Sequence, residues 1–364
     1  MTDGVLITGG AGFIGSHAAA ALLAAGERVR VLDDFSTGRH ENLVGLPGPL
    51  EIVEGDVRSP ETVARAARGC DRILHLAAIA SVTRSFADPA TSEAVNVAGT
   101  ANVLAAAREA GARTVVLASS CAVYGAASEL PVAETAELRP GSPYARSKLA
   151  AEELCRTACR RGEVRAGVLR FFNVYGPRQD PSSDYSGVIA IFMERLSRGE
   201  PCTVYGDGRQ TRDFVYVADV VAACRAALDR RDGGGAPVNI GTGVETSLLD
   251  VLDALGRAGG RQPVVRFAEP REGDTRHSRA ACGLAADLLG FRAGVSFAQG
   301  IAATWSWHVE TRGAGSVDGP RDGAGAGRAA DGAVAAEGAA DGAAGAGPGV
   351  AADGRATGAR TGAN

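Results

Sequence analysis

Tyr144 and Lys148 stand four residues apart, directly after Pro143. If this segment opens a helix, the spacing places both side chains on one face. A cation beside a phenol stabilises the phenolate, so such a tyrosine can act as a general base near neutral pH. Ser119 and Ser120 end a preceding apolar run and can offer a hydroxyl to the same cleft. The pattern Y-x-x-x-K alone is common in ordinary amphipathic helices, so its meaning depends on the rest of the chain.

Three glycines near the N-terminus, Gly9, Gly12 and Gly15, form a G-x-x-G-x-x-G pattern that also contains Phe13 and Ile14. The pattern follows a short apolar run, which predicts a strand, and opens an Ala-rich stretch, which predicts a helix. Glycines permit a tight turn and let backbone amides approach a pyrophosphate at the helix N-terminus. The sequence therefore predicts a dinucleotide-binding turn.

Two carboxylates, Asp33 and Asp34, end the next predicted strand. Asp33 lies 18 residues after Gly15. A carboxylate there can bond adenosine ribose hydroxyls, and the pair repels a 2′-phosphate, so NAD is expected rather than NADP. Arg39 could in principle bind a 2′-phosphate, but a solvated loop arginine is the preferred interpretation. Further loop residues expected at the cofactor are Asp56, Val57, Leu76, Ala77 and Ala78.

Short apolar runs alternate with Ala-rich helical stretches over residues 1–170. Strands are expected at 5–8, 29–32, 51–54, 72–76, 114–118 and 167–171. Continuous apolar strands separated by helices predict a parallel sheet that is buried on both faces. We therefore expect an α/β protein with a Rossmann doubly wound parallel sheet.

The chain is expected to divide into two lobes and a tail. Residues 1–173 would form the NAD-binding Rossmann domain. Residues 174–312 would form a smaller C-terminal substrate-binding lobe, with a partial return to the first domain near residues 213–221. Residues 313–364 contain no aromatic residue, Leu or Ile. A segment that cannot bury apolar area is expected to be a disordered tail.

The composition excludes several classes of function. A net charge of -4 leaves no large basic surface for nucleic acid. No apolar run approaches the roughly 18 residues that span a membrane, and no basic leader is present, so a cytoplasmic protein is expected. The seven cysteines include no C-x-x-C pair, which favours reduced thiols. Cys155 and Cys159 lie on one predicted helix, where a packed face is expected, and no metal is assigned.

Eight longer motifs lie between residues 3 and 311. They are GGAGFIGSH (9–17), DDFSTGRHENL (33–43), HLAAIASVTRSFADP (75–89), SSCAVYG (119–125), SPYARSK (142–148), RFFNVYGPRQDPSS (170–183), YGDGRQTRDFVYV (205–217) and REGDTRHS (271–278). With these motifs the chain resembles the extended short-chain dehydrogenase/reductase family. Within that family it resembles the nucleotide-sugar 4-epimerases of the UDP-glucose/UDP-N-acetylglucosamine type.

The resemblance implies a chemistry for the Ser-Tyr-Lys set. Tyr144 would deprotonate the sugar 4-hydroxyl while a hydride passes from C4 to NAD. Lys148 would lower the tyrosine pKa and bond the nicotinamide ribose, and Ser120 would hydrogen-bond O4. The 4-keto sugar would turn and take the hydride back on its other face. The resemblance also implies a homodimer, and it places Asn96 and Phe172 near the cofactor, with plain packing as the alternative.

The resemblance further implies the surroundings of a UDP-sugar. Asn173, Arg212 and Arg271 would hold the diphosphate, and Asp274 the uridine ribose. The expected substrate-site residues are Ala80, Ser120, Cys121, Ala122, Tyr144, Asn173, Gly187, Val188, Tyr205, Arg212, Arg271, Asp274 and Ser278. Ser278 stands where bulkier side chains exclude an N-acetyl group, so UDP-GlcNAc and UDP-GalNAc are expected substrates besides UDP-Glc and UDP-Gal.

Other activities occur among the relatives. Those that dehydrate or decarboxylate nucleotide sugars need acidic groups just after the serine, where this chain has Cys121 and Ala122. Alanine cannot transfer a proton, which favours epimerisation. A UDP-glucuronate 4-epimerase, or another nucleotide-sugar epimerase or dehydratase, is the alternative. A non-catalytic nucleotide-sensing Rossmann protein is the alternative from another class, although such proteins usually lack the Ser-Tyr-Lys set.

Overall fold

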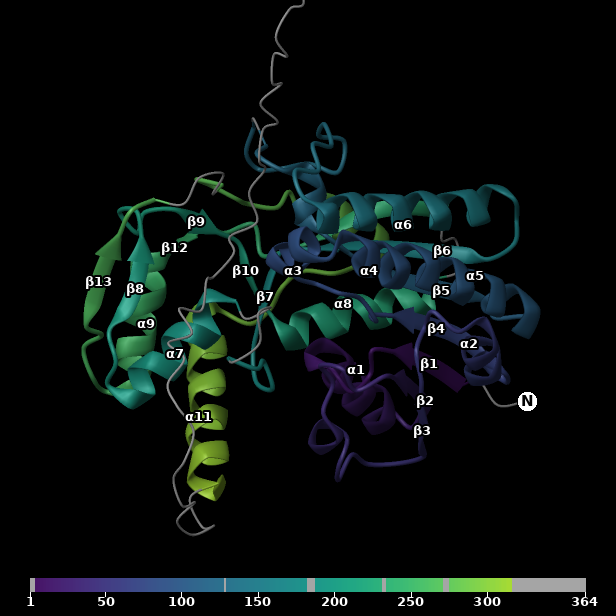
Figure 1. The fold of residues 1–364 in the computed structure, drawn as a ribbon, viewed down its shortest axis with the longest axis horizontal. Helices are drawn as coiled ribbons and strands as arrows, with labels where there is room; N and C mark the ends of the chain where they lie inside the picture. The colour runs from purple at the N-terminus through teal and green to yellow at the C-terminus, as the bar shows by residue number, and fades with distance from the viewer. Residues whose placement is uncertain (1–3, 128, 182–186, 231–233, 271–274, 316–364) are drawn as a thin grey trace, which may run out of the picture.

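The computed structural model describes residues 4–127, 129–181, 187–230, 234–270 and 275–315, of which 312–315 by their backbone only. A parallel sheet lies at its centre, with the strand order β11-β6-β5-β4-β1-β2-β3 (Figure 1). The strands are β1 (Gly4–Thr8), β2 (Arg28–Asp33), β3 (Leu50–Glu54), β4 (Cys70–His75), β5 (Thr114–Ser120), β6 (Arg165–Phe171) and β11 (Gly234–Ile240). All six strands expected from the sequence are present. The order reverses at β1, which confirms the doubly wound α/β fold.

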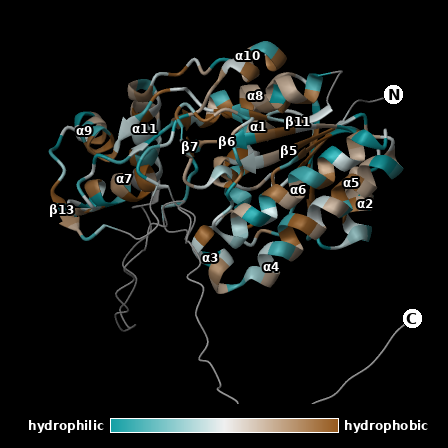
Figure 2. Ribbon diagram, turned by 90° about the horizontal axis from the view of Figure 1, so that it is seen from above, coloured by the Kyte–Doolittle hydropathy of each residue, from teal (hydrophilic) through white to brown (hydrophobic). Residues whose placement is uncertain are grey.

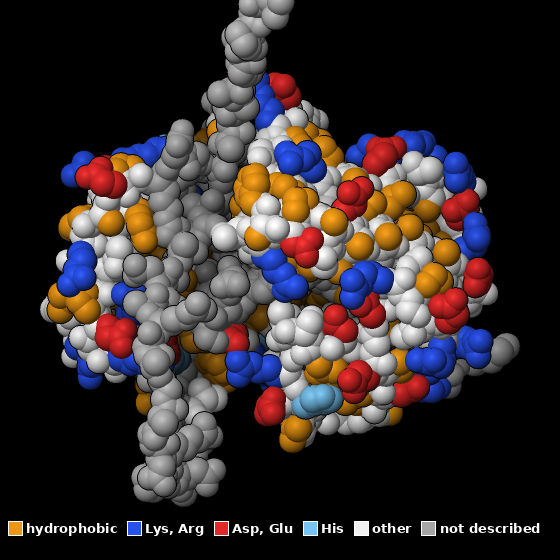
Figure 3. Space-filling view, in the orientation of Figure 1, with side chains coloured by type: hydrophobic (Ala, Val, Ile, Leu, Met, Phe, Trp, Pro, Cys, Tyr) orange, Lys and Arg blue, Asp and Glu red, His pale blue; other side chains and the backbone are white. Residues whose placement is uncertain are grey.

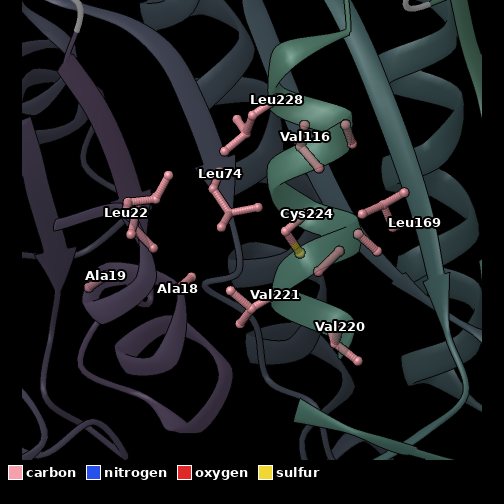
Figure 4. Close-up of a cluster of buried hydrophobic side chains, with 14 of the residues drawn as sticks. Ala18, Ala19, Leu22, Leu74, Val116, Leu169, Val220, Val221, Cys224 and Leu228 are labelled. Atoms are coloured by element: carbon pink, nitrogen blue, oxygen red, sulfur yellow. The ribbon is translucent and has the colours of Figure 1, made fainter. Parts of the chain in front are cut away.

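Helices cover both faces of this sheet. One layer contains α1 (Phe13–Ala24), α8 (Val217–Asp229) and α10 (Gly283–Leu289), and the other contains α2 (Pro60–Ala67), α5 (Gly99–Ala110) and α6 (Pro143–Arg160). In the first layer, Ala18 and Leu22 of α1 meet Val221 and Cys224 of α8 over Leu74 of the sheet (Figure 4). Figure 2 shows the apolar strands between the two helical layers. Burial on both faces accounts for the continuous apolar runs in the sequence.

A second group of elements has an apolar core of its own, which includes Phe192, Val204, Leu255 and Ile301. Three short pairs of strands belong to this part of the chain, β7 with β10, β8 with β13, and β9 with β12. The elements are β7 (Asn173–Tyr175), α7 (Val188–Arg198), β8 (Cys202–Tyr205), β9 (Thr211–Arg212), β10 (Phe214–Tyr216), β12 (Thr246–Ser247), α9 (Leu248–Gly259), β13 (Val265–Ala268) and α11 (Phe297–Gly315). In Figure 1, α7, α9 and α11 lie beside the β8–β13 pair, at the left of the central sheet.

The chain crosses between the two groups of elements more than once. After β10, helix α8 returns to the central sheet and β11 pairs with β6 at its edge. Asp213 lies fully buried at this crossing. Its carboxylate accepts hydrogen bonds from the backbone of Thr242 (2.7 Å), Gly243 (2.9 Å) and Ala280 (3.0 Å). The division of the chain into domains at residue 173 stays a prediction.

Short helices follow the carboxyl ends of the sheet strands. They are η1 (His40–Asn42), α3 (Val82–Ala87), α4 (Pro89–Glu93), the π-helical η2 (Ala94–Ala98) and η3 (Cys121–Tyr124). Helix α11 continues to Gly315, three residues into the expected tail, and residues 316–364 lie outside the described residues. None of the described helices is long and apolar enough to cross a membrane. Figure 3 shows acidic and basic side chains interspersed over the visible face.

Candidate active site

The turn between β1 and α1 is closed tightly by its glycines. Gly9 has a φ of +69°, a left-handed conformation that glycine adopts readily. A Cβ on Gly9 would lie 2.7 Å from the backbone nitrogen of Ala77, and a Cβ on Gly15 would lie 2.1 Å from the Gly9 carbonyl oxygen. Gly12 is the N-cap of α1 and brings no side chain to the amides of the first turn. The turn therefore has the space and the N–H donors that a pyrophosphate requires.

Asp33, at the end of β2, is tied to this turn. Its carboxylate accepts hydrogen bonds from the backbone nitrogens of Ala11 and Phe35, each at 2.9 Å. Burial raises the pKa of Asp33. The neighbouring Asp34 is exposed and accepts hydrogen bonds from Ser36 of its own loop. Asp33 is therefore the carboxylate beside the glycine turn, the position at which the sequence predicts a bond to the adenosine ribose.

The loop after β3 is held by its own side chains. A hydrogen bond from the Arg58 guanidinium, 2.8 Å from Nε, lowers the pKa of Asp56. Val57 is buried against Gly99, and its carbonyl accepts a hydrogen bond from Asn102 Nδ2 at 2.9 Å. These contacts within the protein hold the loop in place, and the Asp56 carboxylate is bonded to Arg58 of the same loop.

His75 and Asn96 support the loop after β4, which contains Leu76, Ala77 and Ala78. His75 lies between two threonine hydroxyls at 2.7 and 3.0 Å, and burial lowers its pKa to about 3, so the ring is neutral. The Asn96 amide accepts from the Ile79 nitrogen (2.8 Å), and it donates to the Ile79 carbonyl and to a serine hydroxyl of α6. Asn96 therefore positions the loop backbone against α6.

Tyr144 and Lys148 both lie on α6, as their spacing predicts. Ser142 caps the helix by accepting a hydrogen bond from the Ala145 nitrogen at 3.1 Å, and Pro143 occupies its first turn. Both side chains of the pair are buried, and Lys148 Nζ lies 6.0 Å from the centroid of the Tyr144 ring. The ammonium is therefore close enough to stabilise the phenolate of Tyr144 electrostatically, because buried surroundings have a low dielectric constant.

Lys148 reaches the end of β5, where the two serines lie. Its Nζ donates a hydrogen bond to the Ala118 carbonyl at 3.0 Å. Burial lowers the pKa of Lys148 to about 8, against the opposing effect of the Glu152 carboxylate. Ser119 donates to Glu152 at 2.5 Å, whereas Ser120 caps η3 by accepting a hydrogen bond from its backbone at 3.2 Å. The Ser119 hydroxyl therefore bonds α6, whereas the Ser120 hydroxyl bonds the backbone of η3.

A pocket lies between η3, the start of α6 and the second group of elements. Its lining residues are Cys121, Ala122, Asn173, Arg212 and Ser278, which the sequence predicted, and Val82, Gly125, Gly141, Ser142 and Thr275, which it did not. Asn173 Oδ1 is buried and has no hydrogen-bond partner among the residues that the structure describes. Arg212 is buried and donates to the Thr275 carbonyl at 2.7 Å. A buried cation and an unsatisfied amide fit a polar, anionic ligand.

Other predicted substrate residues lie elsewhere or cannot be placed. Ala80 is exposed, Gly187 and Val188 open α7, and Tyr205 ends β8, and none of the four lines the pocket. Ser120 and Tyr144 do not line it either, although each is close in sequence to lining residues. Phe172, expected near the cofactor, is buried in an apolar cluster below η3. Arg271 and Asp274 lie outside the described residues. Among the lining residues that were missed, Gly141 and Ser142 directly precede the Y-x-x-x-K helix, so its N-cap was the available signal.

Comparisons with known proteins show the family of this chain. The sequence model of the NAD dependent epimerase/dehydratase family matches residues 5–241. A UDP-glucose 4-epimerase of Mycolicibacterium smegmatis is 42% identical over 303 residues, which cover 82% of this chain and 96% of that protein.

Solved structures are similar over nearly the same length. The UDP-glucose 4-epimerase of Thermus thermophilus in complex with NAD is 40% identical, with a TM-score of 0.77, and the match covers 84% of this chain and 98% of that one. The UDP-N-acetylglucosamine 4-epimerase of Methanobrevibacter ruminantium in complex with UDP-N-acetylmuramic acid is 30% identical, with a TM-score of 0.81, and the match covers 85% and 100%. The chain therefore belongs to the NAD-dependent epimerase/dehydratase family, and its cofactor is NAD.

Proposed function

We propose that this enzyme interconverts the C4 epimers of a UDP-hexose, namely UDP-Glc with UDP-Gal and also UDP-GlcNAc with UDP-GalNAc. The observation that carries the proposal is the pocket whose lining residues Val82 and Ala122 pack against Tyr144. The two positions after Ser120, Cys121 and Ala122, line this pocket and bring no carboxylate to it. Dehydration or decarboxylation needs such an acidic group, whereas epimerisation at C4 needs only the Ser-Tyr-Lys set and the cofactor.

In this proposal Tyr144 accepts the proton of the sugar 4-hydroxyl and later returns it to O4. Bound NAD would supply a reversible hydride acceptor for C4 of the sugar. Lys148 stabilises the tyrosine phenolate, because its ammonium is mostly charged at pH 7 with a pKa of about 8. Ser120 hydrogen-bonds O4 and orients it toward Tyr144. Substrate and product are isomers, so the hydride and the proton taken from the sugar are both returned to it and the net reaction consumes no oxidant.

The protein groups around the cofactor follow from the same proposal. Amides of the first turn of α1 would hold the diphosphate of NAD, and Asp33 would hold the adenosine ribose. Lys148 would bond the nicotinamide ribose in addition to its effect on Tyr144. The remaining residues assigned to the cofactor site are Gly9, Gly12, Phe13, Ile14, Gly15, Asp34, Asp56, Val57, Leu76, Ala77, Ala78 and Asn96, whereas Phe172 packs in its apolar cluster.

The UDP-sugar would lie across the pocket. Asn173 and Arg212 would hold its diphosphate, and the buried, unpartnered Asn173 Oδ1 supports a polar ligand there. Small side chains around Ser278 would leave room for an acetamido group. The similarity to a UDP-N-acetylglucosamine 4-epimerase supports this breadth.

A direct assay tests the proposal against its rivals. Purified enzyme is incubated separately with UDP-Gal, UDP-GalNAc and UDP-glucuronate, and the products are resolved by chromatography. We expect UDP-Glc from the first substrate and UDP-GlcNAc from the second. Turnover of UDP-glucuronate alone would replace the proposal with its nearest alternative, and NAD binding without turnover would indicate a nucleotide-sensing protein. The homodimer stays a prediction that a mass measurement in solution can check.

A further inference from the structure

Arg178 is a half-buried cation outside the residues assigned above. It follows β7, in the segment 176–180. Its Nη1 is buried, and no hydrogen bond or ion pair joins its guanidinium to another residue in the described part of the chain. Burial also lowers the pKa of Arg178. Because a guanidinium is a strong donor that cannot readily be deprotonated, burying it without an acceptor is unfavourable, and a ligand is the natural partner.

The residue before Arg178 places it against α1. The Pro177 carbonyl accepts a hydrogen bond from His17 Nε2 at 2.9 Å, and His17 lies one turn beyond the start of α1. The positive charge of Arg178 also adds to burial in lowering the pKa of His17. The guanidinium is therefore near the helix whose first-turn amides follow the glycine turn.

The other end of the segment contacts the opposite side of the same turn. Asp180 forms an ion pair with Arg39, which belongs to the loop after β2. The backbone nitrogen of Arg39 in turn donates to the carbonyl of Ala11, within the glycine turn, at 3.0 Å. Residues 176–180 therefore run from α1 to the loop after β2, and Arg178 lies between these two contacts.

The backbone of Arg178 is also unusual. Its φ is +66°, in the left-handed region that residues with a Cβ rarely adopt. Such conformations persist where the surrounding contacts enforce them, and they gather at ligand sites. The contacts of Pro177 and Asp180 on either side supply that constraint here.

We propose that Arg178 binds a diphosphate, and that this diphosphate belongs to NAD rather than to the UDP-sugar. A planar guanidinium can bond two phosphate oxygens at once. The cofactor diphosphate lies at the turn that segment 176–180 contacts on both sides, whereas the sugar pocket has Asn173 and Arg212 for its own diphosphate. The proposal depends on the cofactor of the family and not on the sugar that is turned over.

Binding measurements on the purified full chain test the assignment. Arg178→Asn removes the cation with a residue that tolerates a positive φ, and Arg178→Lys keeps the charge. Arg161→Asn, at the exposed end of α6, is the matched control for the loss of one surface charge. Equilibrium dialysis gives the Kd of NAD for nucleotide-free protein, and titration gives the Kd of UDP for protein saturated with NAD. Thermal melting without nucleotide reports whether each variant folds.

We expect Arg178→Asn to weaken NAD binding at least about tenfold, which corresponds to about 1.4 kcal/mol. Arg178→Lys should recover part of that loss, Arg161→Asn should bind NAD like the wild type, and UDP affinity should not change. Unchanged NAD affinity in Arg178→Asn would overturn the proposal. Weaker UDP binding with unchanged NAD binding would assign the guanidinium to the substrate and would also overturn it. If Arg178→Asn does not fold, NAD affinity equal to the wild type in Arg178→Lys together with weaker UDP binding overturns it.

Discussion

Arg170 and Glu152 form an ion pair in the interior of the protein, with Nη2 at 2.7 Å from Oε2 and Nε at 2.9 Å from Oε1. Their side chains are 1% and 0% exposed. The pair joins β6 to α6, and Glu152 also accepts the Ser119 hydroxyl of β5. It therefore fixes the two elements that carry Ser120 and Lys148.

Glu152→Gln should destabilise the protein strongly. Removing one charge of a buried pair leaves the Arg170 guanidinium uncompensated, which typically costs about 3–5 kcal/mol. Urea unfolding measures the loss. Glu153→Gln is the matched control, because Glu153 is exposed and its bonds to Arg156 and Arg160 contribute less than about 1 kcal/mol. Equal losses in both variants would contradict the importance of the buried pair.

Tyr144→Phe should lose most epimerase activity and keep its fold and its bound NAD. General-base catalysis typically contributes about 10²–10⁴-fold, and phenylalanine cannot accept the proton. Steady-state kinetics on UDP-Gal measures kcat, with Tyr216→Phe, in the core of the second group of elements, as the control. Turnover near that of the wild type in Tyr144→Phe would refute the role assigned to this residue.

Lys148→Met should change the pH dependence of stability. The pKa of Lys148 falls from its ordinary value of 10.5 to about 8 in the folded protein, so between these values the unfolded chain binds more protons. The contribution of Lys148 to the free energy of unfolding therefore rises with pH over that window, and its burial penalty is complete below about pH 8.

The variant should thus gain stability over the wild type at pH 7, and the gain should shrink toward pH 10.5. Urea unfolding of nucleotide-free protein gives the free energy of unfolding of the variant and of the wild type at pH 7 and at pH 10. The contributions of the other titrating groups cancel in the difference between the two proteins at each pH. If the difference in free energy of unfolding is the same at both pH values, the pKa of Lys148 is not lowered in the folded protein.

Ser278→Tyr should discriminate between the two sugar series. Overfilling a packed site typically costs about 1–3 kcal/mol, so kcat/KM for UDP-GalNAc should fall by one to two orders of magnitude. UDP-Gal lacks the acetamido group and should be affected far less. Ser278→Ala keeps the space and should leave the ratio of the two substrates unchanged. Equal losses for both substrates in Ser278→Tyr would remove Ser278 as the discriminator.

Features set by local spacing could be predicted from the sequence. Gly9 and Gly15 fall in one turn because few residues separate them, and Tyr144 and Lys148 share a helix face because four residues make about one turn. Asp33 was recognisable because it ends the strand that follows the glycine turn.

Features that depend on distant pairing could not be predicted. Ser119 and Glu152 are 33 residues apart and meet only because α6 packs on β5. Nothing in the type of either residue specifies the other as its partner. Thr275 reaches the pocket for a similar reason, since its carbonyl accepts a bond from Arg212, 63 residues earlier. Such contacts follow from the tertiary fold and have no periodic signal in the sequence.

The return of the chain to the central sheet has a consequence for biosynthesis. Helix α8 and strand β11 lie within residues 217–240, beyond much of the second group of elements, yet α8 covers α1 and β11 pairs with β6. Until these residues leave the ribosome, β6 is an unpaired edge and the apolar side of α1 is uncovered, both of which favour aggregation. The nascent cofactor-binding half therefore depends on its late-synthesised partner elements, and an N-terminal fragment ending at residue 173 should not be a soluble NAD-binding unit.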